Sequence, residues 1–350
     1  MLLPIHASAP GKLVVAGEYA VLDGAPAISL AVASRARVSI QAATDSCILE
    51  VVSSDRDAFE FSWTGEGYVS YLGRQPVARG TMLQQVIGSL KSSLPAAMPL
   101  VRITIDSSEF YSTETAQKLG LGSSAAVCVA LTAALHQLFA STENIDALCF
   151  KVHSDFQGGK GSGVDVASSL AGGLIGFQRL FTHTPAELPN INIKALEPIH
   201  GLYILPVWTG FSASTSEMLQ DLDAYRNKSS DDYKELIEEL TRVSTELIEV
   251  WQAQNIAAVL DLLALYADGL QRLDAAADMG IYSEPHLEFQ RRVVSMGAVY
   301  KPSGAGGGDF GLIFTDSAAT FEKLKEEFAS AMVLQDCASM STGLLVEASS

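Results

Sequence analysis

The chain has 350 residues, 48% of them hydrophobic and 18% charged, so it is long enough for two domains with cores and too apolar for a disordered protein. Its 40 acidic and 23 basic residues give a net charge of −17, which argues against nucleic-acid binding, because that binding requires a basic surface. Residues 1–6 are too short for a signal peptide and no run of about 18 apolar residues occurs, so we expect a cytoplasmic protein without a membrane span.

A turn and a short buried strand come first along the chain. Pro10 and Gly11 are a turn signal, and the apolar residues 13–16 that follow predict the strand. Lys12 lies in this turn, where its ammonium could reach a bound phosphate, although a single lysine is more often a solvated surface charge. The patterns that follow predict two strands, a helix and a third strand, over residues 35–41, 48–52, 80–94 and 101–105.

The central stretch, residues 118–126, places two glycines and two serines directly before a helical run at 127–139. Glycine permits positive φ and a close approach of backbone to ligand, and the free N–H groups at a helix start form an anion site. The hydroxyls of Ser123 and Ser124 can add contacts to phosphate oxygens or to a divalent metal. The stretch is not a Walker A loop, because no Gly-Lys-Ser/Thr follows at the required spacing. A serine-capped helix after a tight turn is the alternative, and these residues alone do not decide between the two.

A second glycine-rich loop, residues 157–163, follows a helix expected at 144–156. The loop leads through Asp165 into a helix of small residues. Asp165 is either a catalytic carboxylate or an acidic residue that complements the dipole at a helix start, and both interpretations stay open at this point.

The second half begins with buried strands expected at residues 174–177 and 202–207. The latter strand leads into a hydroxyl-rich segment that opens a helix, and we call residues 208–215 the hydroxyl loop. The weakly periodic, proline-bearing residues 182–198 suggest a domain boundary. Two helices, a glycine-rich segment, a strand and a last helix are then expected over residues 231–254, 256–270, 301–311, 312–314 and 318–332.

The four cysteines, Cys47, Cys128, Cys149 and Cys337, show neither metal-ligand spacing nor a disulfide framework. We therefore expect buried free thiols in a reducing compartment.

Three of these stretches resemble, in order and spacing, the three motifs of the GHMP kinases. Residues 10–21 resemble the first motif, residues 120–126 the second, which holds the ATP phosphates, and residues 303–309 the third. Each motif alone is a weak pattern, but three in order over residues 9–311 are specific. The resemblance covers nearly the whole chain.

Within the family, residues 17–21, 161–167 and the hydroxyl loop are most similar to the branch whose acceptor is 5-phosphomevalonate. The resemblance implies transfer of the ATP γ-phosphoryl group to this acceptor, giving 5-diphosphomevalonate in the mevalonate pathway of isoprenoid biosynthesis. A mevalonate kinase or another small-molecule kinase of the family is the alternative. Mevalonate kinases carry a metal-binding glutamate on the helix before the aspartate, where residues 153–157 here offer Asp155 and no glutamate.

Two readings outside the kinases are less favoured. Related ATP-dependent decarboxylases lack the lysine of the first motif, so Lys12 argues for a kinase. A non-catalytic ATP-binding module would bind nucleotide without turning over any acceptor.

The resemblance implies an α+β fold of two domains, the GHMP kinase fold. An ATP-binding domain at residues 1–185 would contain a left-handed βαβ unit like that of a ribosomal protein, an exception to the usual hand. A ferredoxin-like domain would occupy residues 186–350. ATP would lie between the two, over the second motif.

The family's roles carry over to matching positions in this chain. The ATP phosphates would be held by Gly120, Leu121, Gly122, Ser123, Ser124 and Ala125, with the Ser124 hydroxyl on Mg²⁺. Lys12 would contact the transferring group and Asp165 the reacting centre. Because a phosphate monoester is mostly dianionic at pH 7, we expect Asp165 to orient Lys12 or the acceptor more than to remove a proton. The acceptor would contact Ser212, Ser214, Thr215, Gly306 and Gly307.

The remaining expectations concern partners. We expect a small-molecule substrate, no nucleic acid, no membrane, and a monomer or homodimer. The sequence does not decide which basic residue binds the acceptor's own phosphate. Lys118, Lys160, Arg35 and Arg74 are candidates, although a lysine or arginine is more often a surface charge.

Overall fold

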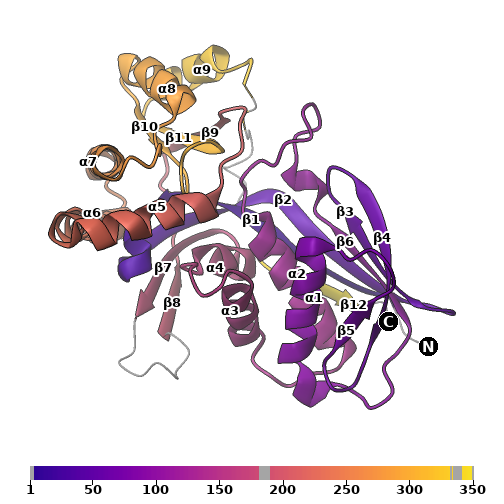
Figure 1. Cartoon of the computed structure of the whole chain (residues 1–350). Helices are drawn as coiled ribbons and strands as arrows, with labels where there is room; N and C mark the ends of the chain where they lie inside the picture. The colour runs from indigo at the N-terminus through magenta and orange to yellow at the C-terminus, as the bar shows by residue number, and fades with distance from the viewer. Residues whose placement is uncertain (1–3, 181–189, 332, 334–340, 349–350) are drawn as a thin grey trace.

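The computed structural model describes residues 4–180, 190–331, 333 and 341–348, and it places two β-sheets and their helices side by side (Figure 1). The larger sheet has the strand order β12-β1-β2-β6-β3-β4-β5, with β7 beside β2 and β8 beside β7. Its strands are β1 (Ile5–Ala16), β2 (Ala27–Ala42), β3 (Cys47–Val52), β4 (Arg56–Trp63), β5 (Val69–Tyr71), β6 (Val101–Asp106), β7 (Leu174–Leu180), β8 (Asn190–Ala195) and β12 (Leu345–Ala348). The described pairs are antiparallel except for β3 and β6, which are parallel.

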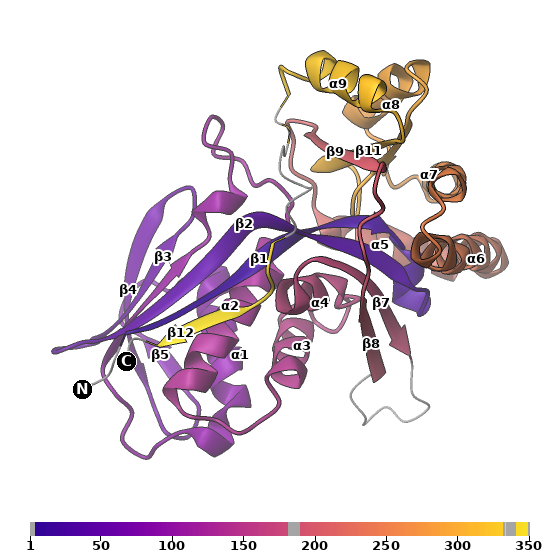
Figure 2. The ribbon, with the colours of Figure 1, turned by 180° about the vertical axis from the view of Figure 1, so that it is seen from behind.

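Four helices cover one face of this sheet, as both views show (Figures 1 and 2). They are α1 (Val77–Ser89), α2 (Ser123–Leu138), α3 (Ile145–Phe156) and α4 (Val164–Ala171). Helix α2 is almost wholly buried from Ser123 to Leu135, because its small and apolar residues surround the whole helix rather than one stripe. Its N-terminus is therefore fixed firmly at the point where the second motif ends.

The smaller sheet has the order β10-β11-β9, with β9 at Tyr203–Trp208, β10 at Val299–Pro302 and β11 at Phe310–Thr315. Every residue of β11 is buried, since Leu312 and Phe314 join the main core while Ile313 packs in a separate cluster with α8 (Glu284–Ser295) and α9 (Ala318–Glu327). The other helices of this part are α5 (Thr215–Lys228), α6 (Ser230–Gln252) and α7 (Ile256–Ala277).

The expected α+β class is confirmed. The division at residue 185 stays a prediction, and β8 and β12, which lie beyond it, belong to the larger sheet. The left-handed crossover also stays a prediction. None of the described helices is long and apolar enough to cross a lipid bilayer.

The expected elements differ from the observed ones mainly at their ends. Helix α7 continues beyond residue 270, and α1 ends earlier than residue 94 and gives way to a short 3₁₀ turn at Lys91–Ser93. The last expected helix ends at Glu327, and its final residue, 332, lies outside the described residues. Three of the four cysteines are buried free thiols as expected, and Cys337 lies outside the described residues.

Candidate active site

A cavity of about 510 Å³ lies where the first, second and third motifs meet the hydroxyl loop. Its walls come from β1 and the turn after it, from the start of α2, from the start of α4, and from the segment between β10 and β11. Of the residues expected to form the site, the cavity is lined by Lys12, Gly120, Gly122, Ser124, Asp165, Ser212, Ser214 and Thr215.

Lys12 reaches the cavity because β1 is irregular at this point. The pairing of β1 with β2 shifts between Pro10 and Lys12, and the Lys12 N–H leaves the sheet to donate to the Leu121 carbonyl at 2.8 Å. The side chain then passes between two glycines. A Cβ on Gly122 would lie 3.1 Å from Lys12 Cγ, and one on Gly304 would lie 3.4 Å from Lys12 Nζ. The second and third motifs therefore leave a channel for this lysine.

The second motif turns sharply into α2. Gly120 and Gly122 have φ values of 76° and 77°, in the left-handed region that favours glycine. Three of the six residues expected to hold phosphate line the cavity, while Leu121, Ser123 and Ala125 are buried beneath the turn. The Ser123 hydroxyl has no hydrogen-bond partner among the described residues. These three residues do not line the cavity, and their contact with the phosphates stays a prediction.

His153 lies between Ser124 and Asp165, although sequence reasoning did not select it. Its ring is buried, with Nε2 3.4 Å from Ser124 Oγ and 3.9 Å from Asp165 Oδ2. Asp155, considered from the sequence, is exposed and pairs with Lys151 at 2.8 Å. The spacing along the helix could have indicated His153. Cys149 and His153 are four residues apart and share the buried face of α3, whereas Lys151 and Asp155 share the solvent face.

Asp165 occupies the first turn of α4, directly after the left-handed Gly163. Its Oδ1 accepts a hydrogen bond from the Val166 N–H at 3.0 Å, and the carboxylate lines the cavity. Both interpretations from the sequence therefore have a physical basis here, because the residue is at a helix start and also faces the cavity.

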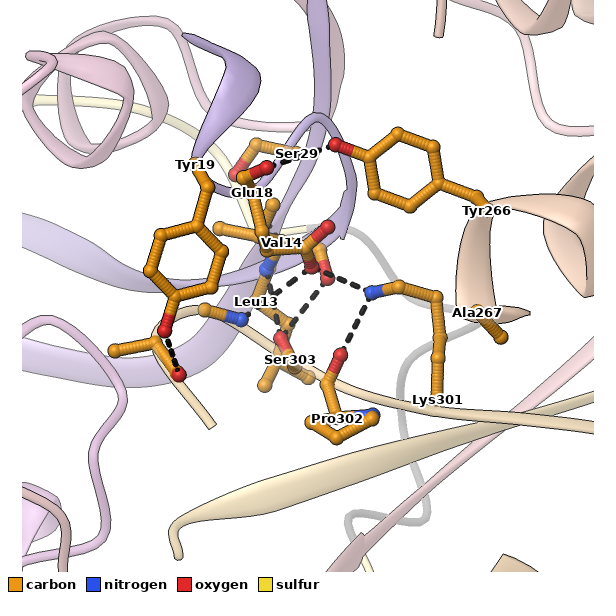
Figure 3. A network of polar contacts seen from close by, with 12 residues as sticks. Leu13, Val14, Glu18, Tyr19, Ser29, Tyr266, Ala267, Lys301, Pro302 and Ser303 are labelled. Carbon is orange, nitrogen blue, oxygen red and sulfur yellow. Dashed lines mark hydrogen bonds and ion pairs between the residues drawn. The ribbon is translucent and has the colours of Figure 1, made fainter. Parts of the chain in front are cut away.

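A buried ion pair joins the first motif to the strand before the third (Figure 3). Lys301 is fully buried, and its Nζ donates to Glu18 Oε1 at 2.5 Å and to the Pro302 carbonyl at 2.7 Å. Burial lowers the pKa of Lys301, and the Glu18 carboxylate opposes this change. Glu18 Oε2 has no partner among the described residues. The pair went unrecognised in the sequence because its members are far apart in the chain.

Further contacts fix the first motif to its neighbours, as Figure 3 shows. Ser303 Oγ accepts from the Val14 N–H and donates to the Val14 carbonyl, each at 2.9 Å. The Tyr266 hydroxyl on α7 donates to the Glu18 carbonyl at 2.8 Å, and the Tyr19 hydroxyl donates to the Ala305 carbonyl. Residues of α7, of β10 and of the segment after β10 therefore hold the first motif in place.

The third motif contributes different residues from those expected. Gly304, Ala305 and Asp309 line the cavity. Gly306 and Gly307 lie behind this wall, since a Cβ on Gly306 would meet the Ile281 carbonyl at 2.6 Å and one on Gly307 would meet the Met218 sulfur at 3.3 Å. Neither glycine lines the cavity, and the expected contact of these two residues with the acceptor stays a prediction.

The cavity holds two lysines and an unexpected carboxylate. Lys118 lines the wall, where partial desolvation lowers its pKa and the nearby Arg79 lowers it further. Partial burial raises the pKa of Asp309. The hydrogen bond from the Ala213 N–H and the charges of Lys12 and Lys118 lower this pKa and so oppose the effect of burial.

The other three basic candidates for phosphate contact do not line the cavity and have other partners. Lys160 pairs with Asp223 at 3.3 Å, Arg74 pairs with Asp57, and Arg35 donates to the carbonyls of residues 342 and 343.

The oxygen atoms near Ser124 suit a magnesium ion. Mg²⁺ prefers oxygen ligands and usually takes only one or two from the protein, keeping waters and substrate phosphates for the rest. The Ser124 hydroxyl and the Asp165 carboxylate supply such oxygens at the cavity wall. The described residues contain no group of three or more His, Cys, Asp or Glu side chains that could hold a metal by themselves.

Comparison with known proteins confirms the expected type of fold. Residues 82–173 match the GHMP kinases N terminal domain. The chain is 31% identical over 340 residues to a phosphomevalonate kinase of Streptomyces sp. (strain CL190), covering 89% of this chain and 90% of the relative. It is 26% identical over 315 residues to a mevalonate kinase of Aeropyrum pernix, covering 88% of each.

A solved structure shows the same fold. The Streptococcus pneumoniae phosphomevalonate kinase in complex with phosphomevalonate and AMPPNP superposes with a TM-score of 0.73 and 21% identity, over 98% of this chain and 99% of that one. At this identity the likeness concerns the fold alone.

Proposed function

Because the chain belongs to the GHMP kinase family, we propose that it transfers the γ-phosphoryl group of ATP to 5-phosphomevalonate, giving 5-diphosphomevalonate and ADP. One observation supports this most: Lys12, the second motif, Asp165 and the hydroxyl loop, which are far apart in sequence, line a single cavity. The 31% identity with the Streptomyces enzyme over nearly the whole chain favours this acceptor.

The ATP phosphates bind over Gly120, Gly122 and Ser124 in this proposal. The start of α2 lies at the cavity wall through Gly122 and Ser124, where its free backbone N–H groups and the positive end of the helix dipole would attract an anion. Lys12 and Lys118 supply two positive charges on the same wall. Phosphoryl transfer has a loose transition state, so positioning and neutralisation of charge account for most of its catalysis.

Asp165 has an orienting role in this reaction. The phosphate of the acceptor is mostly dianionic at neutral pH and is already nucleophilic, so it carries little proton for a base to remove. The carboxylate, fixed through the Val166 N–H, instead orients Lys12 or the acceptor. Mg²⁺, when bound by the Ser124 hydroxyl and Asp165, would supply charge neutralisation to the ATP phosphates.

The hydroxyl loop is the proposed acceptor side of the cavity. Ser212, Ser214 and Thr215 line it at the start of α5. The Ser214 side chain caps this helix by accepting from the Glu217 N–H at 3.4 Å, which sets the direction of the helix start. We also place the protein in the cytoplasm, in line with its three buried free thiols.

The test is an ADP-release assay over a panel of phosphomevalonate, mevalonate, homoserine and a sugar. We expect kcat/KM to be far larger for phosphomevalonate, because a site built to bind a second phosphate loses up to about 10⁴-fold with an analogue that lacks it. A larger value for mevalonate would assign the chain to the mevalonate kinases, which are also among its relatives. Release of CO₂ from the acceptor would point to a decarboxylase instead.

A further inference from the structure

A carboxylate lies within the proposed phosphate site. A Cβ on Gly120 would lie 2.0 Å from Asp309 Cγ and 2.2 Å from its Oδ2, so the side chain is packed against the turn of the second motif. A loop that presents N–H groups and the positive end of a helix dipole attracts any anion, including a carboxylate of the same chain. The Asp309 carboxylate therefore stands close to the place proposed for the ATP phosphates.

The backbone holds Asp309 there. Its N–H donates to the Phe211 carbonyl at 2.7 Å, its carbonyl accepts from the Thr209 N–H at 2.9 Å, and its Oδ1 accepts from the Ala213 N–H at 3.1 Å. These three bonds join it to the hydroxyl loop. Its φ of 58° is in the left-handed region, which residues other than glycine rarely adopt. The position of the carboxylate is thus fixed by main-chain bonds.

The charges around Asp309 are those proposed to bind phosphate. Lys12 and Lys118 both act on this carboxylate, and both line the cavity. Asp165 and Glu18 are the other acidic side chains in the lining, and Glu18 is already paired with Lys301. Asp309 is therefore a fixed anion in the same cavity as the two lysines.

We propose that Asp309 is an internal competitor for phosphate: its carboxylate shares the Gly120 turn, Lys12 and Lys118 with the bound phosphates, weakens ADP binding and thereby speeds product release. The inference rests on the proposed function in taking ADP as the ligand. Loss of product is a common rate-limiting step, so a fixed negative charge beside the phosphates has a direct kinetic use.

The variant Asp309→Asn isolates the charge. Asparagine tolerates the left-handed conformation and keeps an oxygen that can accept from the Ala213 N–H, while the negative charge is lost. We expect this variant to bind ADP about tenfold more tightly in calorimetry, because the repulsion from one partly screened charge is removed. It should also release a fluorescent ADP analogue about tenfold more slowly. Structural damage would weaken binding, so a gain of affinity identifies the charge effect.

Asp57→Asn is the matched control, because it removes the same charge from an exposed pair with Arg74 outside the cavity. We expect its ADP affinity to stay within about twofold of the unchanged chain. If Asp309→Asn fails to fold, Asp309→Ser also removes the charge and keeps an acceptor, and it should tighten ADP in the same way.

Equal or weaker ADP binding by the folded charge-free variants would overturn the inference and leave Asp309 as an anchor of the hydroxyl loop. That result is distinguishable from failure of the proposed function, because the unchanged chain would still release ADP in the presence of phosphomevalonate. An unchanged chain that binds no ADP and turns over no acceptor would overturn both.

Discussion

Lys12 is enclosed by the second and third motifs, since its side chain runs between Gly122 and Gly304. Lys12→Ala should keep the fold, because the Lys12 backbone bond to Leu121 does not involve the side chain. We expect kcat to fall on the order of 10²-fold or more, as when one electrostatic stabiliser is removed from an active site. Steady-state kinetics with a thermal unfolding curve would check this, and retained kcat would remove Lys12 from the mechanism.

His286 makes the stability of the protein depend on pH. The neutral ring donates from Nε2 to the Gly308 carbonyl at 2.8 Å and accepts at Nδ1 from the Tyr300 hydroxyl at 2.6 Å. Burial lowers the pKa of His286 to about 4 from its ordinary value of 6.5. The unfolded chain therefore binds the proton first as the pH falls, and stability decreases between pH 6.5 and about 4.

The full effect of His286 is about 3 kcal/mol at the low end of this range. Urea unfolding at pH 7 and at pH 4.5 would measure it. In His286→Gln the difference in unfolding free energy between the two pH values should shrink by a substantial part of this amount. An unchanged difference would mean that other groups cause the acid sensitivity.

At the scale of elements, the pair of Glu18 and Lys301 couples β10 to the turn after β1. Lys301→Met leaves a buried carboxylate without its partner, which costs about 3–5 kcal/mol in comparable cases. Combining it with Glu18→Gln should restore much of the loss, because no uncompensated charge then remains. Denaturant unfolding of the single and double variants would show this. A single variant as stable as the unchanged chain would mean that water or an ion solvates Glu18.

In the proposed function, residues at the start of α5 distinguish phosphomevalonate from mevalonate. The double change Ser214→Ala and Thr215→Ala removes two hydroxyls from the cavity wall and one helix cap. We expect kcat/KM to fall more for phosphomevalonate than for mevalonate, so that the gap between them narrows. Equal losses on both acceptors would indicate that the two hydroxyls only support the helix.

Helices and strands whose apolar residues recur with a clear period could be predicted from the sequence. Those that form only by pairing with segments far away in the chain could not. Helix α6 was expected because its apolar positions form one continuous stripe. Helix α8 was not, since only His286, Phe289 and Val293 of its twelve residues are buried and the helix is polar on average. Strand β12 is four residues long, and only its pairing with β1 makes it recognisable.

The same limit applies to the candidate site. The glycine-rich motifs were visible because a phosphate turn needs particular residues at adjacent positions. The sequence did not single out Gly304, Ala305 and Asp309 as the third-motif residues that line the cavity, because a run of glycines does not reveal which way its turn faces. Glu18 and Lys301 could have been suspected as charges within buried runs, but their pairing is a property of the fold.

For the whole molecule, the two sheets share their packing as well as the cavity. The cluster formed by α5, α6 and α7 includes Tyr19, Ala20 and Ala25 from the turn after β1. The main core likewise combines β11 with strands of the larger sheet. The relative position of the two sheets, and with it the cavity, is therefore set by buried apolar contacts from both parts of the chain.

The pairing of β1 with β12 also sets the order in which the larger sheet can be completed during translation. Ile5 pairs with Ala348, so one edge of β1 has no neighbour until the ribosome has added nearly all of the described chain, at roughly 5–20 residues per second. An open strand edge is a template for pairing with other chains. Residues Ile5 to Ser8 of β1 therefore lack this neighbour through most of synthesis, and a chain stalled before Leu345 would keep that short edge unpaired.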